Sequence, residues 1–329
     1  MTTFGLRYAL RRPAWAKTPR QDLYRACVEQ CAWGDKQGFA TVMISEHHGS
    51  PDGYMPSPLV VGGAIAAVTE HMRIRISSLI PTLHNPVRFA EDLATLDILS
   101  NGRAEPVLSG GYVGTEFDML GTSLSNRKAH MDMIVPFLHK AWSGEPFEWE
   151  GKTIHVTPRP VQRPMPVWMG GASKAAARRA AKYADLFQPS KAELMTTYYE
   201  EQDRLGIARK PVLPRSTMAW VAEDPDEFWE QFGPHALHEN NEYGQWYEDW
   251  DAWNGYVKTE SLDTLRETGL YPILTPDELI EKALSLGPDG FVMLHPLCGG
   301  FSPELAWKSL KLVAEKVLLP LKEIEEASA

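Results

Sequence analysis

Glu46, His47 and His48 are the residues of this sequence with the clearest capacity for chemistry. They follow directly on an apolar run, residues 40–45. Imidazole can donate, accept and shuttle a proton near neutral pH, and a neighbouring carboxylate can orient it. General acid–base catalysis is therefore one interpretation of this group, and a structural role for the histidines is the other.

A metal site is a third interpretation, and we do not expect one. Adjacent histidines on an extended chain point to opposite sides, so a metal ion would need further ligands. The sequence shows no His-x-x-x-His helix and no second carboxylate cluster. Cys27, Cys31 and Cys298 have neither zinc nor redox spacing, so we expect buried thiols that pack as small apolar side chains, without a disulfide.

Two glycine-containing turns could bring the backbone close to a ligand. The first turn connects an apolar run to a helix and consists of Gly170, Gly171, Ala172 and Ser173. Free backbone N–H groups at a helix start bind anions such as phosphate. The second turn, Ser109 with Gly110, follows another apolar run, and there an ordinary tight turn is the alternative to close approach of a flat ring or a phosphate.

Four other residues are candidates for a substrate pocket: Tyr54, His235, His238 and His295. His295 follows the last apolar run, at the end of a strand where barrel enzymes place active-site residues. His235 and His238 are three residues apart and therefore share one face of an expected helix. A structural or surface role is the alternative for each of these histidines.

The elements that must position these residues alternate between apolar runs of strand length and segments of helical periodicity. Eight such repeats predict an α/β protein, a single (β/α)8 TIM barrel over residues 1–329, in preference to a two-domain doubly wound fold. The expected strands are residues 4–10, 40–45, 73–80, 103–109, 167–169, 186–188, 217–222 and 290–294. The expected helices are residues 22–37, 59–68, 86–99, about 125–142, 175–183, about 191–205, 276–286 and 303–317.

Two insertions interrupt this alternation. A segment at about residues 145–160 predicts a surface hairpin that turns at Glu150 and Gly151. A longer segment, about residues 224–271, is rich in aromatic residues, and it is either a local core or a lid over an apolar pocket. Its aromatic residues include Trp229, Tyr243, Trp246, Tyr247, Trp250, Trp253 and Tyr256.

Composition limits the classes of partner. The formal net charge is −10 and no basic run occurs, so we expect neither nucleic acid nor an anionic membrane as a partner. The absence of an apolar stretch of about 18 residues and of a signal-peptide layout predicts a cytoplasmic protein. Without a Rossmann glycine motif, a Walker loop or a Gly-x-Ser-x-Gly elbow, nicotinamide binding by a Rossmann site and triad hydrolysis have no support.

Three segments together carry a resemblance to a known family. They are residues 82–103, residues 45–48 and residues 166–173. The chain resembles the bacterial luciferase-like flavin- and deazaflavin-dependent oxidoreductases from Phe4 to about Leu321, and the stretch from Asn85 to Arg103 is the most specific part of the match.

The resemblance implies roles for several residues. In the family, the histidine that corresponds to His47 faces the flavin ring and is associated with catalysis. A non-prolyl cis peptide lies behind the ring, here at about Ser77 and Ser78. The phosphate site falls on residues 170–173. Family members often carry a larger or charged residue where Gly110 stands, so a side-chain contact from that position is absent here.

The resemblance also implies a function. We expect a monooxygenase in which reduced FMN, supplied by a separate flavin reductase, reacts with dioxygen to oxidise a small hydrophobic substrate. Hydride transfer with the deazaflavin coenzyme is the alternative within the family, and a non-catalytic flavin-binding protein is the alternative outside it. Family members commonly dimerise, so a homodimer is expected.

Overall fold

The structure, a computed structural model, describes residues 2–213, 216–248 and 255–328. The chain divides into two compact units, each described here by itself. The first unit comprises Met1–Met43, Ser50–Met55 and Ser216–Ala329, and the second comprises Ile44–Gly49 and Pro56–Arg215.

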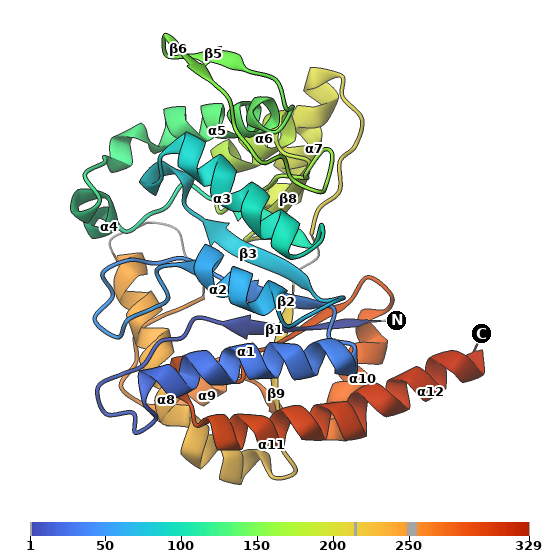
Figure 1. Cartoon of the computed structure of the whole chain (residues 1–329). Helices are drawn as coiled ribbons and strands as arrows, with labels where there is room; N and C mark the ends of the chain where they lie inside the picture. Colours follow the sequence, from blue (N-terminus) through green and yellow to red (C-terminus); the bar gives the residue numbers. More distant parts are fainter. Residues whose placement is uncertain (1, 214–215, 249–254, 329) are drawn as a thin grey trace. The chain divides into compact units, whose positions relative to one another are not determined.

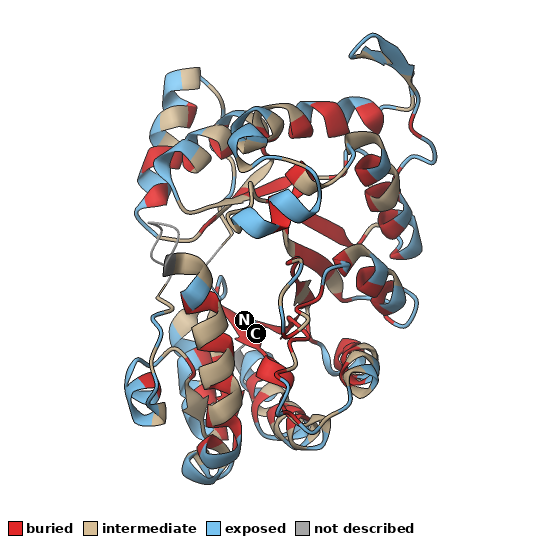
Figure 2. Ribbon diagram, turned by 90° about the vertical axis from the view of Figure 1, so that its left-hand side faces the viewer, coloured by how far each residue is buried: buried red, intermediate tan, exposed pale blue. Residues whose placement is uncertain are grey.

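Eight strands, each followed by at least one helix, confirm the predicted α/β alternation (Figure 1). These strands are β1 (Thr3–Tyr8), β2 (Thr41–Ile44), β3 (Arg73–Leu79), β4 (Ala104–Leu108), β7 (Trp168–Gly171), β8 (Leu186–Pro189), β9 (Thr217–Val221) and β11 (Phe291–Leu294). The order is β10-β9-β11-β1-β2 in the first unit, where β10 is Ile273–Leu274, and β3-β4-β7-β8 in the second. In these two orders the pairs β10–β9, β9–β11, β11–β1, β3–β4, β4–β7 and β7–β8 run parallel. The strands are largely buried, as their red colour in Figure 2 shows.

The helices of the second unit are α2 (Pro58–Ala66), α3 (Pro86–Leu99), α4 (Gly114–Met119), α5 (Arg127–Ala141), α6 (Lys174–Tyr183) and α7 (Leu194–Leu205). Helix α3 has the predicted bounds. Its start is fixed by the Asn85 side chain, which accepts hydrogen bonds from the N–H groups of Val87 and Arg88, and by Pro86 in the first turn. The expected surface hairpin is present as β5 (Phe147–Trp149) and β6 (Lys152–Ile154), which pair antiparallel. The sequence did not predict α4.

The helices of the first unit are α1 (Arg20–Gln37), α8 (Pro225–Glu248), α9 (Leu262–Glu267), α10 (Pro276–Leu286), α11 (Pro303–Val313) and α12 (Leu319–Ser328). Helix α1 ends at Gly38, whose φ of 89° few other residues adopt easily. The last expected helix, residues 303–317, ends earlier as an α-helix, at Val313, and a π-helical turn at Ala314–Leu318 joins it to α12. None of the described helices has the length and apolar character needed to span a membrane.

Helix α8 accounts for most of the aromatic insertion, and it contributes to the core of its own unit. Trp229 and Tyr243 are buried, and the Tyr243 ring stacks on Tyr256 with centroids 4.8 Å apart. This observation agrees with the local-core interpretation, whereas the lid stays a prediction. Trp250 and Trp253 lie outside the described residues.

Arg103 is the last residue of the stretch Asn85–Arg103, the most specific part of the family resemblance described above. Its guanidinium is buried and donates hydrogen bonds to the carbonyl oxygens of Ala66, Thr69, Met72 and Ser100 at 2.6–3.2 Å. A buried charge is tolerated only when its hydrogen-bonding capacity is filled, and these carbonyls fill it. Arg103 therefore ties the end of α2 and the loop before β3 to the end of α3.

Candidate active site

The strand ends of the second unit bring three predicted serines together. The peptide bond between Ser77 and Ser78 is cis, as the family resemblance implied. The Ser109 hydroxyl at the end of β4 donates a hydrogen bond to the Ser78 hydroxyl at 2.8 Å, and the Ser77 hydroxyl donates to Gln188 Oε1 on β8 at 2.8 Å. Side chains from β3, β4 and β8 therefore build one polar surface.

Gly170 has no side chain, so its backbone lies directly against this polar surface. A Cβ atom at this position would lie 2.7 Å from the Ser109 hydroxyl oxygen and 3.3 Å from that of Ser78. At Gly171 a Cβ would lie only 2.4 Å from the Cβ of Ala176. The absence of both side chains lets the backbone pack closely against the serines and the first turn of α6.

Replacing Gly170 with Ala should therefore weaken binding of the cofactor. The added methyl group displaces the Ser109 hydroxyl, so we expect the dissociation constant for flavin to rise by at least tenfold, about 1.4 kcal/mol. Gly114→Ala is the matched control, because nothing lies within 4 Å of a Cβ at that position. Fluorescence titration would show the difference. Equal affinities of the two variants would rule out a flavin site beside Gly170, Ser78 and Ser109.

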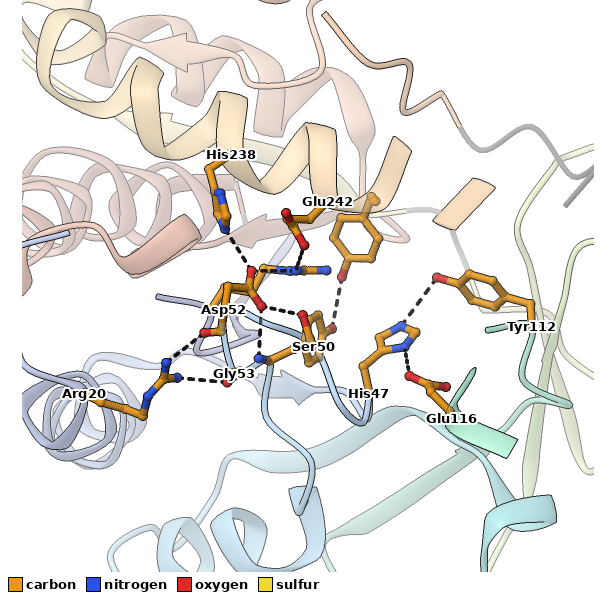
Figure 3. A network of polar contacts seen from close by, with 12 residues as sticks. Arg20, His47, Ser50, Asp52, Gly53, Tyr112, Glu116, His238 and Glu242 are labelled. Carbon is orange, nitrogen blue, oxygen red and sulfur yellow. Dashed lines mark hydrogen bonds and ion pairs between the residues drawn. The ribbon is translucent and has the colours of Figure 1, made fainter. Parts of the chain in front are cut away.

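His47 is held by a carboxylate that the sequence analysis did not identify. Its Nδ1 lies 2.8 Å from Glu116 Oε1, and its Nε2 lies 3.4 Å from the Tyr112 hydroxyl (Figure 3). Glu116 is 1% exposed, and its Oε1 also accepts a hydrogen bond from the backbone N–H of His48. A carboxylate oxygen of Glu116 pairs with the tautomer that carries N–H at Nδ1, and in that tautomer Nε2 is the acceptor beside the Tyr112 hydroxyl.

Glu46 has a different environment from His47. Its buried carboxylate accepts hydrogen bonds from His48 Nε2 at 2.8 Å, His84 Nε2 at 2.6 Å and the backbone N–H of Ile80 at 2.8 Å. Burial alone would raise the pKa of Glu46, but the hydrogen bonds from the two histidines outweigh it and lower the pKa. Burial would likewise lower the pKa of His48, but the hydrogen bond and charge of Glu46 raise it. Through the hydrogen bond from Ile80, Glu46 thus connects the loop that follows β2 to the residue that follows β3.

This cluster should make stability depend on pH in two directions. The lowered pKa of Glu46 contributes stability above about pH 4.3, its unfolded value, which is lost as pH falls through the folded pKa. The raised pKa of His48 contributes stability below about pH 6.5, which is lost as pH rises through the folded pKa. Denaturant titrations of wild type and Glu46→Gln should therefore differ most between about pH 4.3 and 6.5, by about 2 kcal/mol. A constant difference from pH 3 to pH 9 would contradict this account.

The predicted anion turn lies at the start of α6. The Ser173 hydroxyl accepts a hydrogen bond from the N–H of Ala176 at 3.2 Å, so it caps the helix. Gly170, Gly171 and Ala172 are half-buried, and Ser173 is exposed. Near the second predicted turn, Arg127 Nη1 donates a hydrogen bond to the Gly111 carbonyl oxygen at 3.1 Å. Arg127 is thus a cation beside this turn, although position 110 itself has no side chain.

The four predicted pocket residues all belong to the first unit, and three of them have side-chain hydrogen bonds there. His238 Nε2 lies 2.9 Å from Asp52 Oδ2, which also accepts a hydrogen bond from Arg11 Nη1 at 2.7 Å (Figure 3). The Tyr54 hydroxyl lies 3.0 Å from that of Tyr243. His235 Nδ1 donates to the Gly299 carbonyl at 2.8 Å. Contact of Tyr54 and these histidines with a substrate stays a prediction.

His295, the fourth of these residues, is fully buried next to Glu239 of α8. Burial alone would raise the pKa of Glu239, but positive charge on His295, Arg7 and Arg11 outweighs burial and lowers the pKa to about 2. Burial lowers the pKa of His295. At neutral pH the pair therefore consists of a carboxylate, kept ionised by the two arginines, and a neutral imidazole.

Several residues of the strand-end site escaped the sequence analysis: Tyr112, Glu116 and Arg127, which flank it, and His84 and Gln188, which bind Glu46 and Ser77. Glu116 lies on α4, a six-residue helix too short to show periodicity. Gln188 could have been found, because it belongs to the predicted strand 186–188. Tyr112 could also have been found, because it lies in the loop after β4, where barrel enzymes place site residues.

The order of strands and helices defines a protein of the (β/α)8 barrel class, with insertions. The sequence matches the luciferase-like monooxygenase family over residues 2–288, and the chain belongs to this family. The crystal structure of the monooxygenase RslO1 from Streptomyces bottropensis is similar to this one with a TM-score of 0.75 at 22% identity, over 97% of this chain and 99% of that chain. Long-chain alkane monooxygenase (LadA) is similar with a TM-score of 0.71 at 15% identity, over 98% and 92% of the two chains. At these identities the likeness shows the luciferase-like barrel fold.

Curated relatives match over shorter stretches. The oxygenase component of the flavin-dependent trigonelline monooxygenase of Acinetobacter baylyi is 25% identical over 174 residues, which are 50% of this chain and 48% of that protein. The F420-dependent glucose-6-phosphate dehydrogenase of Nakamurella multipartita is 29% identical over 167 residues, 46% and 48% of the two chains. The chain thus spans about half the length of these relatives. Flavin and deazaflavin enzymes both occur among them.

Proposed function

We propose that this protein is a flavin-dependent monooxygenase that uses reduced FMN and dioxygen to oxidise a small hydrophobic substrate. The observation that carries the proposal is the close packing of the Gly170 backbone against the Ser78 and Ser109 hydroxyls, which leaves no room for a Cβ atom. Membership of the luciferase-like monooxygenase family supports the same cofactor class. When bound, the flavin supplies the chemistry with oxygen, and the residues of the chain supply position, polarity and protons.

Each part of the strand-end site has a role in this proposal. Ser77, Ser78, Ser109 and Gly170 would hold the ring. The turn at Gly170, Gly171, Ala172 and Ser173 would bind the phosphate through its N–H groups, with Arg127 near Gly110 as a further cation.

His47 is the proposed catalytic residue. Glu116 keeps the proton of the imidazole on Nδ1, so that Nε2 accepts or returns a proton beside the Tyr112 hydroxyl. Glu46 and His48, which we also expected to be catalytic, bind each other, and we assign them to positioning the chain around His47. The Glu46 carboxylate in particular already accepts three hydrogen bonds, as a positioning residue would.

A reductase partner is part of the proposal, because no nicotinamide motif occurs in the sequence. The name of the Acinetobacter relative, an oxygenase component, supports this division of labour. The homodimer and the cytoplasmic location are expectations of the same kind. Hydride transfer with the deazaflavin coenzyme is the second candidate function, and the relative from Nakamurella favours it.

Oxygen incorporation distinguishes the two candidates. The protein would be incubated with a flavin reductase, FMN, a nicotinamide reductant and a panel of aromatic and aliphatic substrates under isotopically labelled dioxygen. The proposal predicts a product that carries the label and that requires both proteins. Oxidation of a substrate with deazaflavin under anaerobic conditions, without any labelled product under oxygen, would support the second candidate instead.

A further inference from the structure

Three potential metal ligands converge in the first unit, whereas the residues assigned to the flavin belong to the second unit. They are Glu239 on α8, His295 directly after β11, and Cys298 at the start of the 3₁₀ turn Cys298–Gly300. All three are fully buried, and their ligand atoms lie within 4.8 Å of one another. Cys298 has no zinc spacing to Cys27 or Cys31, and its position three residues after His295 was not predicted to matter.

Hydrogen bonds of the backbone set the geometry of this cluster. The Cys298 N–H donates to the carbonyl of His295 at 3.3 Å, which closes a tight His-x-x-Cys turn, and the Trp220 indole donates to the same carbonyl at 2.8 Å. His235 Nδ1 donates a hydrogen bond to the Gly299 carbonyl oxygen at 2.8 Å. Because His235 and Glu239 are one helical turn apart on α8, this contact aligns Glu239 with the turn.

Several polar atoms of the cluster make no hydrogen bond in the described part of the chain. Both carboxylate oxygens of Glu239, both ring nitrogens of His295 and the hydroxyl of buried Tyr271 have no hydrogen bond there. A buried polar atom without a partner costs about 1–3 kcal/mol, and native structures contain few of them. Several such atoms directed at one another indicate a bound species that satisfies them.

The separation of the ligand atoms suits a zinc ion. Glu239 Oε1 and His295 Nδ1 lie 3.4 Å apart, without hydrogen-bond geometry. Two ligands bound tetrahedrally at about 2.0–2.2 Å from zinc are separated by about 3.4 Å. We propose that Glu239, His295 and Cys298 bind one Zn²⁺ ion, with a water molecule in the fourth position. Imidazole and thiolate select zinc over Mg²⁺ and Ca²⁺, and all three ligands are fully buried.

Two arginines lie near the cluster, and one of them, Arg11, has a carboxylate partner of its own. Arg11 is paired with Asp52, whose Oδ2 is 2.7 Å from Arg11 Nη1. Arg7 Nη1 lies 3.8 Å from Glu239 Oε1 and opposes a cation, which lowers its affinity. When zinc binds, the S–H bond of Cys298 breaks, the sulfur–zinc bond forms and the proton leaves to solvent. The Glu239 carboxylate and the Cys298 thiolate then neutralise the two positive charges of the ion.

The metal content of the purified full-length protein tests this site. After incubation with ZnCl₂ and removal of free metal, mass spectrometry should find about one zinc per chain in the wild type. Cys298→Ala and His295→Gln should each lower this content at least tenfold. Cys31→Ala is the matched control, since Cys31 is a buried thiol on α1, and it should retain the ion. Less than a tenth of an equivalent in the wild type, or full retention by Cys298→Ala, would overturn the proposal.

Cobalt substitution tests the sulfur ligand in the unmutated fold. Loading the metal-free wild type with Co²⁺ should produce the intense near-ultraviolet absorption of thiolate-to-cobalt charge transfer. Cys31→Ala should show the same band. Stoichiometric cobalt without this band would overturn the assignment of Cys298 as a ligand. This readout does not depend on activity or on flavin, so it is independent of the proposed monooxygenase function.

Discussion

His47→Ala should reduce turnover with reduced flavin by about 100- to 10,000-fold, the range that a positioned acid–base group contributes. Glu116 Oε1 lies 2.8 Å from Nδ1, so in the proposed mechanism Nε2 is the atom that exchanges the proton. Removal of the imidazole leaves the packing of Gly170 against Ser78 and Ser109 intact, so the dissociation constant for flavin should change less than threefold, below about 0.7 kcal/mol. Steady-state kinetics and flavin titration of the same preparation measure the two quantities.

Two further variants make this prediction specific. His155→Ala removes an exposed histidine of the hairpin region and should leave turnover unchanged. Glu116→Gln keeps the size of the side chain but loses its charge, so we expect a smaller decrease in turnover and a shifted pH profile, as a positioning residue would give. Normal turnover of His47→Ala would remove this residue from the mechanism, whatever the cofactor.

Arg103→Met should lower the free energy of unfolding by about 3–5 kcal/mol. The substitution keeps an apolar stem but removes the donors that satisfy the carbonyls of Ala66, Thr69, Met72 and Ser100. Those oxygens would then be buried without partners. Urea titration followed by circular dichroism measures the change.

Arg88→Met is the matched control for Arg103. Arg88 lies on α3 with a side chain 72% exposed, and its ion pairs with Glu91 and Asp92 face solvent. Exposed pairs contribute about 0–1 kcal/mol, so this substitution should have little effect. Similar destabilisation by the two substitutions would show that the hydrogen bonds of Arg103 do not hold the segment in place.

Local rules explain which parts of the fold could be predicted from the sequence. Asn85 and Pro86 define the start of α3, and Gly38 ends α1 with a positive φ, so these boundaries depend on neighbouring residues alone. The end of the last α-helix was predicted incorrectly, because a π-helical turn keeps helical periodicity while it changes the hydrogen bonding.

The site was predictable only where it follows strand ends. Glu46, His47 and Ser109 directly follow apolar runs, and in a barrel this position alone marks them as candidates. Glu116 is far from His47 in sequence, and nothing in the pattern of a six-residue helix indicates that its carboxylate meets that imidazole. The convergence of Glu239, His295 and Cys298 likewise depends on how α8 packs in its unit, which periodicity does not describe.

Anaerobic titration of the protein with reduced FMN, oxidised FMN and the reduced deazaflavin coenzyme tests the central claim most directly. We predict that reduced FMN binds at least tenfold more tightly than the deazaflavin, and that Gly170→Ala loses this binding whereas Gly114→Ala keeps it. Tighter binding of the deazaflavin would replace the monooxygenase with a hydride-transfer enzyme. Binding of neither cofactor would contradict the assignment of the strand-end site.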